Sequence, residues 1–358
     1  MLLTHLGWNE RLEQQFEPHR HDGLSPARVV REDRGRYRIN DGEERSAEVS
    51  GRFRHETHDR TLFPAVGDWV AVRLAEGDGP TTIVAVLPRG SVFVRRAVGE
   101  TTEAQVVAAN IDTVFVMAGL DNDYNPRRIE RYVTAAWESG AQPVIVLNKA
   151  DLTDDLDAMI AETELTAPGV PVVALSARDG AGLDALAPWL VPGKSIALLG
   201  MSGVGKSTLV NALCGEERQA TKDVREWDSR GRHTTTHREL VPLPGGAILI
   251  DTPGMRVLQL WAGEGALEET FPELDALAGA CKFGDCKHVS EPGCAVLAAV
   301  GSGALAAERL ASWRKLQREL KWLDGKQNQL AKIQETQRWK SLHKSMKSHP
   351  KLRARGER

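Results

Sequence analysis

The sequence has no long apolar run and no opening segment that resembles a secretory signal. Of its 358 residues, 41% are apolar, which is ordinary for a protein that folds in water. The longest weakly polar stretch, residues 294–307, is rich in Ala and Gly and is too short to cross a bilayer. The first residues are interrupted by His5 and Gly7 and then followed by charge. We therefore expect a cytoplasmic protein of two or three domains without a membrane partner.

Cysteine is scarce, and three of the four cysteines are clustered. Cys281, Cys286 and Cys294 stand with His288 in the spacing C-x₄-C-x-H-x₅-C. Three thiolates and one imidazole form a closed tetrahedral shell suited to one structural zinc ion. A disulfide pair is the alternative, which a cytosolic location disfavours. Cys214 stands alone on an apolar helix, where we expect a small core residue.

The strongest motif is a phosphate-binding loop that follows the pattern G-x-x-x-x-G-K-[ST]. It lies between an apolar strand, expected over residues 196–199, and a helix expected to begin near Lys206. In such a loop the backbone amides bind the α and β phosphates, the lysine reaches the β and γ phosphates, and the hydroxyl of Ser207 binds Mg²⁺. A glycine-rich turn without a ligand is the alternative. The predicted phosphate contacts are Gly200, Met201, Ser202, Gly203, Val204, Gly205, Lys206, Ser207 and Thr208.

A second motif selects the base. Asn148, Lys149, Ala150 and Asp151 follow an apolar strand expected over residues 143–147. The Asp151 carboxylate can accept from both guanine N1 and the exocyclic N2, whereas adenine offers no such pair of donors. Lys149 would lay its aliphatic stem on the base. A further strand, expected over residues 173–178, ends in Ser176, Ala177 and Arg178, like the second base-contacting loop of guanine-nucleotide proteins.

Two further segments have the character of nucleotide switches. Asp251 and Gly254 belong to a D-T-P-G motif after an apolar strand; Asp251 would hold Mg²⁺ through water and the Gly254 amide would sense the γ phosphate. Upstream, residues 231–236 are polar and include Thr234 and Thr235, one of which should ligate Mg²⁺. A threonine run is also compatible with an edge strand. Magnesium is therefore expected on Ser207, Thr235 and Asp251.

The glutamine that many GTPases use to orient the attacking water is missing. Met255 follows Gly254, and its thioether can neither donate strongly nor act as a base. Hydrolysis without a partner should therefore be slow. His233 is a candidate replacement, with a solvated loop histidine as the alternative. The candidate catalytic residues are His233, Lys206, Thr234 and Thr235.

The order of these motifs is the reverse of the usual one, because the base-reading motif precedes the phosphate loop. From residue 111 onward the pattern alternates strand and helix, which predicts an α/β sheet with helices on both faces. The pieces can still form one site, since they meet in space and not in sequence. The fold class is therefore multidomain, with a circularly permuted P-loop GTPase domain at its centre.

The segment before this domain has the sequence pattern of a small β-barrel. Five short strands are separated by Gly-Asp and Asp-Gly turns, which fits a barrel of the oligonucleotide-binding (OB) type. An SH3-like barrel is the alternative. The expected strands are residues 27–31, 36–39, 47–50, 68–74 and 81–87.

The end of the chain is basic. Residues 313–358 contain 14 Lys and Arg against 4 Asp and Glu, although the whole chain carries a net charge of −3. Residues 304–330 show helical spacing of leucines. Beyond them, basic residues alternate with Trp339, His343 and His349, which favours RNA contact, with a solubilising tail as the alternative.

Together these patterns divide the chain into five segments. We expect an N-terminal arm over residues 1–26, the barrel over 27–98, the GTPase domain over 99–262, a mostly helical zinc-binding domain over 263–330 and a basic tail over 331–358. No coiled-coil or dimer seam is visible, so a monomer is expected.

In combination, the motifs resemble the ribosome small subunit-dependent GTPase A family, over roughly residues 27–320. The resemblance implies a late-acting assembly factor that binds the small ribosomal subunit and its rRNA with GTP, and leaves after hydrolysis to GDP. It also implies that the subunit accelerates turnover. Carried over onto matching positions, residues 148, 149 and 151 bind guanine, residues 200–208 bind phosphates and the Cys₃His cluster binds zinc. The arm and the basic tail match least.

Two other classes remain open on sequence alone. A P-loop kinase or ATPase would explain residues 200–207 but leaves Asp151 without a purpose. A nucleic-acid-binding scaffold with an inactive nucleotide site would explain the barrel, the zinc cluster and the tail.

Overall fold

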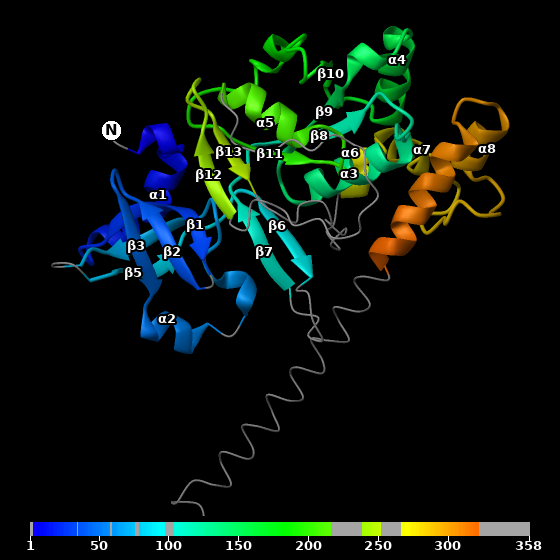
Figure 1. The fold of residues 1–358 in the computed structure, drawn as a ribbon. Coiled ribbons are helices and arrows are strands. Elements are labelled where there is room, and N and C mark those ends of the chain that lie inside the picture. Colours follow the sequence, from blue (N-terminus) through cyan, green and yellow to red (C-terminus); the bar gives the residue numbers. More distant parts are fainter. Residues whose placement is uncertain are drawn as a thin grey trace, which may run out of the picture.

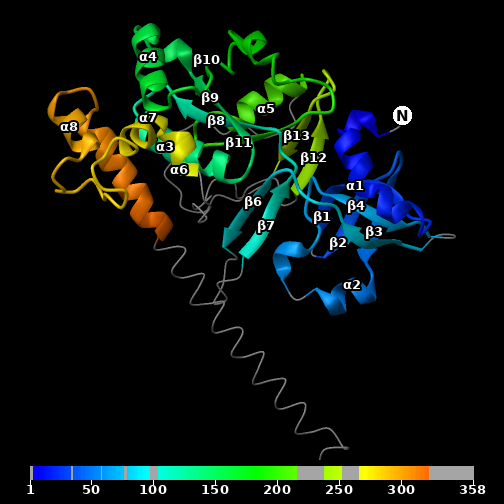
Figure 2. The same ribbon diagram turned by 180° about the vertical axis from the view of Figure 1, so that it is seen from behind.

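Three parts follow one another along the molecule: a barrel, an α/β part and a helical C-terminal part (Figure 1). The computed structural model describes residues 3–33, 35–57, 59–75, 79–96, 104–215, 238–251 and 266–321. In the reverse view, the barrel and the C-terminal part again lie on opposite sides of the α/β part (Figure 2).

The first five strands close into a barrel. Their order is β1-β2-β3-β5-β4-β1; β3 pairs with β5 in parallel, and the other pairs are antiparallel. Closure leaves no free strand edge, and the interior is filled by small and β-branched side chains such as Val29, Ile39 and Val72. The five-stranded barrel is therefore confirmed. The strands are β1 (Ser25–Asp33), β2 (Arg36–Asn40), β3 (Glu44–Val49), β4 (Trp69–Arg73) and β5 (Thr81–Val86), with α2 (Gly51–Glu56) and η2 (Arg60–Leu62) between β3 and β4.

The N-terminal arm packs against the barrel. It contains η1 (Thr4–Leu6) and α1 (Glu10–Arg20), whose first turn is capped because the Asn9 side chain accepts from the Leu12 amide. Leu12 and Phe16 are buried in one cluster with Trp69 of β4. Trp8 meets the same tryptophan edge to face, with ring centroids 4.8 Å apart. The arm is therefore part of the folded barrel unit.

The α/β part has the strand order β10-β9-β8-β11-β13-β12. All neighbours in it are parallel except β12, which is antiparallel to β13. The strand that leads into the phosphate loop is β11, and it lies at the centre between β8 and β13. The strands are β8 (Thr113–Gly119), β9 (Gln142–Asn148), β10 (Val172–Ala174), β11 (Ser195–Leu199), β12 (Arg238–Pro242) and β13 (Ile248–Asp251).

Helices cover both faces of this sheet, because its strands are apolar on both sides. Val114 and Val116 of β8 pack with α3 and α4 on one face, while Phe115 and Met117 pack with α5 and η4 on the other. Asn125 caps α3 by accepting from the Arg128 amide at 3.1 Å. These helices are α3 (Pro126–Glu138), α4 (Leu156–Thr166), η4 (Leu183–Leu186) and α5 (Lys206–Cys214); η3 (Ala150–Leu152) follows β9.

The barrel and the α/β sheet are continuous through one strand pair. β1 pairs with β12 in antiparallel register, with Arg31 opposite Glu239. A hairpin of β6 (Val92–Arg96) and β7 (Ala104–Ala109) joins the two parts in sequence. We did not predict either connection from the sequence.

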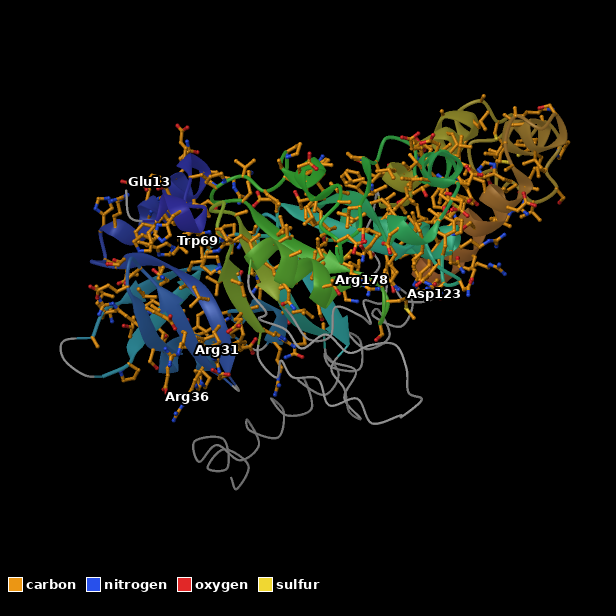
Figure 3. The ribbon with its side chains drawn as sticks, turned by 45° about the horizontal axis from the view of Figure 1, so that its top comes forward. Glu13, Arg31, Arg36, Trp69, Asp123 and Arg178 are labelled. Atoms are coloured by element: carbon orange, nitrogen blue, oxygen red, sulfur yellow. The ribbon has the colours of Figure 1, made fainter. Side chains whose placement is uncertain are left out.

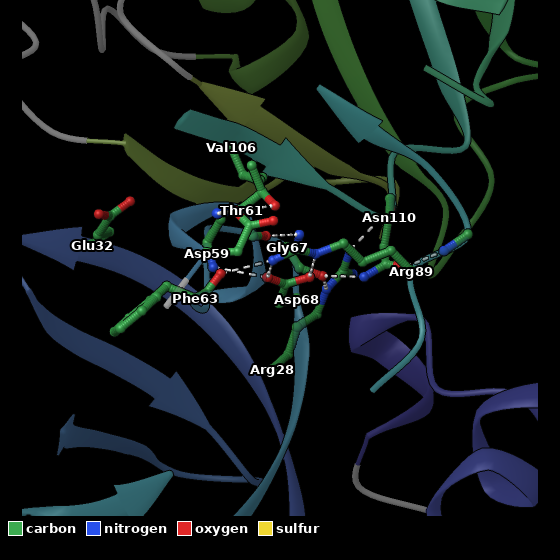
Figure 4. A network of polar contacts seen from close by, with 12 residues as sticks. Arg28, Glu32, Asp59, Thr61, Phe63, Gly67, Asp68, Arg89, Val106 and Asn110 are labelled. Atoms are coloured by element: carbon green, nitrogen blue, oxygen red, sulfur yellow. Dashed lines mark hydrogen bonds and ion pairs between the residues drawn. The ribbon is translucent and has the colours of Figure 1, made fainter. Parts of the chain in front are cut away.

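A buried polar network also joins these parts (Figure 4). Arg89 binds both carboxylate oxygens of Asp68, at 2.8 and 2.7 Å. Arg28 of β1 donates to the Gly67 carbonyl and to Ser195 Oγ at the start of β11. Burial lowers the pKa of Arg28 to about 10, which is still high enough to keep its guanidinium charged at neutral pH.

The C-terminal part is helical and meets α3 through α6 and through its last helix. Its helices are α6 (Ala266–Thr270), α7 (Pro272–Ala278), α8 (Ala295–Gly301) and a helix that is described over residues 307–321. The last helix begins later than the expected residue 304, because Gly303 turns with a φ of 77° after α8. In the parts of the chain that the structure describes, no helix is both long and apolar enough to cross a membrane.

Candidate nucleotide and metal sites

Three loops meet at the carboxyl ends of adjacent parallel strands. Gly119 at the end of β8 is in register with Asn148 at the end of β9, and Leu199 of β11 is in register with Val116 of β8. The loops after residues 119, 148 and 199 therefore emerge at one edge of the sheet. Open α/β sheets bind their ligands at this edge.

The phosphate loop is shaped by glycines that no other residue can replace without disturbance. A Cβ on Gly200 would lie 2.6 Å from the Met117 carbonyl oxygen. Gly205 has a φ of 96°, and a Cβ there would lie 2.2 Å from the Asn148 Nδ2 atom. The backbone thus passes very close to β8 and to the base-reading motif, and α5 begins at the next residue, Lys206.

Lys206 lies across its own loop. Its Nζ donates to the carbonyl oxygens of Gly200 at 2.7 Å and Met201 at 2.5 Å. Ser202 and Gly203 are exposed, so the loop opens to solvent. The positive end of the α5 dipole lies at this loop and favours an anion in this position.

Asn148 is buried and joins two loops with its side-chain amide. Its Nδ2 donates to the Val204 carbonyl at 2.8 Å, and its Oδ1 accepts from the Ala177 amide at 2.9 Å. Both ends of the amide are therefore used within the protein. The side chain holds the phosphate loop against the loop after β10.

Lys149 and Asp151 have different surroundings. Lys149 has a left-handed backbone, with a φ of 65°, and its Nζ forms an ion pair with Asp121 Oδ2 at 2.5 Å. Asp151 is exposed on η3, and the Ala150 amide donates to the Leu175 carbonyl at 3.1 Å. An exposed carboxylate at this edge is available to a ligand.

The second base loop is longer than its sequence suggests. We predicted a strand over residues 173–178, but β10 ends at Ala174. The chain turns instead, because the Gly180 amide donates to the Ser176 carbonyl and Ser176 Oγ pairs with Asp179 Oδ2 at 3.2 Å. Ser176 and Ala177 are buried beside Asn148 and Arg178 is exposed, so the predicted loop meets the predicted motif.

Several predicted site residues cannot be placed. His233, Thr234, Thr235 and Gly254 lie outside the described residues. Asp251 is the last residue of β13, beside the strand that leads into the phosphate loop. The catalytic and magnesium assignments on these residues stay predictions.

The clustered cysteines and histidine do meet. One ligand atom from each of Cys281, Cys286, His288 and Cys294 lies within 4.8 Å of the others. His288 Nδ1 is 3.6 Å from Cys281 Sγ and 3.4 Å from Cys294 Sγ. Tetrahedral zinc with Zn–S bonds of about 2.3 Å requires ligand atoms about 3.8 Å apart, so the four residues fit a metal ion of this kind.

The surroundings of the cluster fix its histidine. His288 has a φ of 56°, its carbonyl accepts from Arg314, and its ring packs on Trp313 with centroids 5.6 Å apart. Burial lowers the pKa of His288, which favours the neutral imidazole that binds metals. Glu291 organises the same loop by accepting from the amides of Lys287, Val289 and Ser290.

Comparisons with known proteins agree with this geometry. A family model described as RsgA GTPase matches residues 86–261. A protein from Opitutus terrae named small ribosomal subunit biogenesis GTPase RsgA is 48% identical, over 100% of this chain and 100% of its own. This chain belongs to the RsgA GTPase family. It is therefore a GTP hydrolase, and the kinase and ATPase alternatives are excluded.

Other members and solved structures extend the comparison. A protein from Lactiplantibacillus plantarum named small ribosomal subunit biogenesis GTPase RsgA 2 is 48% identical over 87% of this chain and 89% of its own. The crystal structure of YjeQ from Thermotoga maritima superposes with a TM-score of 0.63 at 28% identity, over 83% of this chain and 98% of that one. YloQ, described as a circularly permuted GTPase, gives a TM-score of 0.61 at 25% identity, over 85% of this chain and 97% of that one. The permuted fold is thus confirmed.

The sequence analysis did not single out Asp121, the partner of Lys149 in the ion pair at this edge. Asp121 comes two residues after the end of β8, and Lys149 comes directly after the end of β9, so the parallel register of the two strands brings both residues to the same edge. A polar residue just after a buried strand was the available signal. It was overlooked because Asp121 belongs to no nucleotide-binding motif.

Proposed function

We propose that this GTPase binds the small ribosomal subunit in its GTP-bound state, assists late maturation of that subunit and leaves after hydrolysing GTP to GDP and phosphate. Similarity over the whole chain to a relative named for small ribosomal subunit biogenesis supports this role most directly. The barrel and the basic C-terminal sequence offer contacts for rRNA. Such a partner implies action in the cytoplasm, and we propose that the protein acts as a monomer.

Each loop at the carboxyl edge of the sheet has a part in this proposal. Asp151 would accept from guanine N1 and N2, and Lys149 would cover one face of the base. Residues 200–208 would bind the phosphates, with Lys206 exchanging the loop carbonyls for phosphate oxygens. Ser207, Thr235 and Asp251 would hold Mg²⁺, which neutralises charge on the transferred phosphoryl group when bound.

We also propose one structural zinc ion on Cys281, Cys286, His288 and Cys294. All four positions of a tetrahedral shell are supplied by the protein, so no position is open for a substrate. Zinc here would hold the loop between α7 and α8 together.

Release of phosphate from GTP and from ATP tests the proposed function, each with the protein alone, with purified small subunits and with large subunits. We expect strong acceleration only for GTP with small subunits. Lys206→Ala should remove this turnover while the circular dichroism spectrum is kept. Lys194→Ala is the matched control. Lys194 is exposed just before β11, at the end of the strand away from the phosphate loop, and its side chain forms an ion pair with Asp112. Turnover indifferent to ribosomal subunits would contradict the proposal.

A further inference from the structure

A carboxylate outside the recognised motifs is built into the base-binding edge. Asp121 stands in the loop between β8 and α3, and this loop is attached to the base-reading motif by the backbone, since the Leu120 amide donates to the Asn148 carbonyl at 2.8 Å. Leu120 itself is buried in the core of the α/β part. The position of Asp121 relative to Lys149 is therefore fixed by the sheet and its core.

The Asp121 carboxylate is also oriented within its own turn. Its Oδ1 accepts from the Asp123 amide at 3.1 Å, and its backbone carbonyl accepts from the Tyr124 amide at 3.0 Å. This is the local pattern in which an aspartate side chain braces a turn. Its Oδ2 then faces Lys149 Nζ at 2.5 Å.

Lys149 is consequently held at both ends. Its backbone has a left-handed φ of 65°, which sets the direction in which the side chain leaves the strand. Its ammonium group is bound by Asp121, and both side chains are about one-quarter exposed. A lysine that is free in solution loses much rotamer freedom when it is ordered, and a lysine that is already ordered does not.

We propose that Asp121 is a positioning residue for the guanine nucleotide, which holds Lys149 in the conformation that covers the base. This inference rests on the proposed role of Lys149 in base binding. Asp121 acts at the base end of the site, which is identical in GTP and GDP. It therefore raises the affinity for both nucleotides equally and does not change the hydrolysis of bound GTP.

Titration of fluorescent GTP and GDP analogues into the full-length protein tests this. Asp121→Ala should raise both dissociation constants about tenfold, while phosphate release at saturating GTP with small subunits stays at the wild-type rate. Asp123→Ala is the matched control, because the carboxylate of Asp123, which Figure 3 labels, belongs to the same turn but pairs with Arg128 at 2.7 Å. Its affinities should equal those of the wild type.

A double-mutant cycle with Lys149→Ala separates the possible failures. If Lys149→Ala leaves the affinities unchanged, the proposed role of Lys149 fails. If Lys149→Ala weakens binding but Asp121→Ala does not, the inference about Asp121 is overturned. It is also overturned if Asp121→Ala weakens binding by the same factor in the Lys149→Ala variant as in the wild type. Asp121→Asn keeps the shape and the turn acceptor but removes the charge, so it carries the test if Asp121→Ala does not fold.

Discussion

At the scale of single residues, the phosphate loop contains one glycine that is required because a side chain would collide with a neighbour, and another that is favoured only by its backbone conformation. Gly203 and Gly205 both have positive φ, 83° and 96°. A Cβ on Gly203 would meet nothing within 4 Å, whereas one on Gly205 would collide with Asn148. The two positions therefore separate backbone strain from steric conflict.

Gly203→Ala should destabilise the protein by about 1 kcal/mol through strain at positive φ. Gly205→Ala should cost at least about 2 kcal/mol more, because Asn148 must then give up hydrogen bonds to the phosphate loop and to Ala177. Urea unfolding of both variants measures the difference, and nucleotide titration should show binding lost only in Gly205→Ala. Equal stabilities for the two variants would contradict the role given to Asn148.

Most residues of the nucleotide edge could be predicted from the sequence, and the reason is local. The spacing of a motif predicts which functional residues stand at a strand end or a helix start, as for Asn148 and Lys206. It does not predict the hydrogen-bond partners of their side chains. The amide of Asn148 is used between two protein loops, and the partner of Lys149 comes from another strand end, because both depend on the register of neighbouring strands.

At the scale of elements, the loop between α7 and α8, which carries the proposed zinc ligands, is organised around one acidic residue. Backbone amides, including those of residues 287, 289 and 290, donate to Glu291 and hold its pKa at about 2. Because the folded-state pKa lies below the ordinary value of 4.5, the stabilisation is fully present above that value and is lost as pH falls toward 2. At neutral pH the loop should be fully braced.

Glu291→Ala should therefore release bound zinc to a chelator several-fold faster at pH 7, since residues 287–290 lose their common acceptor. The rate can be followed with a coloured chelator on the metal-loaded protein. Asp285→Ala is the control, because Asp285 is exposed in the same loop and its removal changes the charge equally. Equal release rates in the two variants would show that Glu291 does not organise the metal site.

The helices and strands were largely predictable where the sequence contains residues that start or end them. Asn125 and Pro126 mark the start of α3, and Gly140 follows its end with a φ of 83°. The end of β10 was misjudged, because Leu175 to Ala177 are buried like a strand but bend around Asn148. Burial was correctly inferred there, and the direction of the chain was not.

At the scale of the whole molecule, the order of the three parts could be predicted but their junctions could not. The barrel joins the sheet through β1 and β12, and the C-terminal helices join α3 through Arg309 and Glu130. These partners are about 200 and 179 residues apart in sequence. Local periodicity carries no information about contacts between residues so far apart, so the sequence did not predict how the parts meet.

Arg309 is the central residue of the C-terminal junction. Its guanidinium binds Glu130 of α3 at 2.8 Å and Glu273 of α7 at 2.6 Å, and it lies 4.1 Å from the ring centroid of Phe271. Glu130 is buried and accepts also from Ser312. Removing Arg309 would leave a buried carboxylate without its cation, which is costly.

Arg309→Met should destabilise the protein by about 3–5 kcal/mol. Arg131→Met is the matched control, because Arg131 of α3 also joins the last helix, by pairing with Glu319 at 2.6 Å, but the two side chains are 35% and 26% exposed. Its loss should cost at most about 1 kcal/mol. Urea unfolding of the zinc-loaded protein gives both values, and proteolysis should cut first in the C-terminal part of Arg309→Met. If the two variants were equally stable, the C-terminal part would not be held to α3 by the buried arginine.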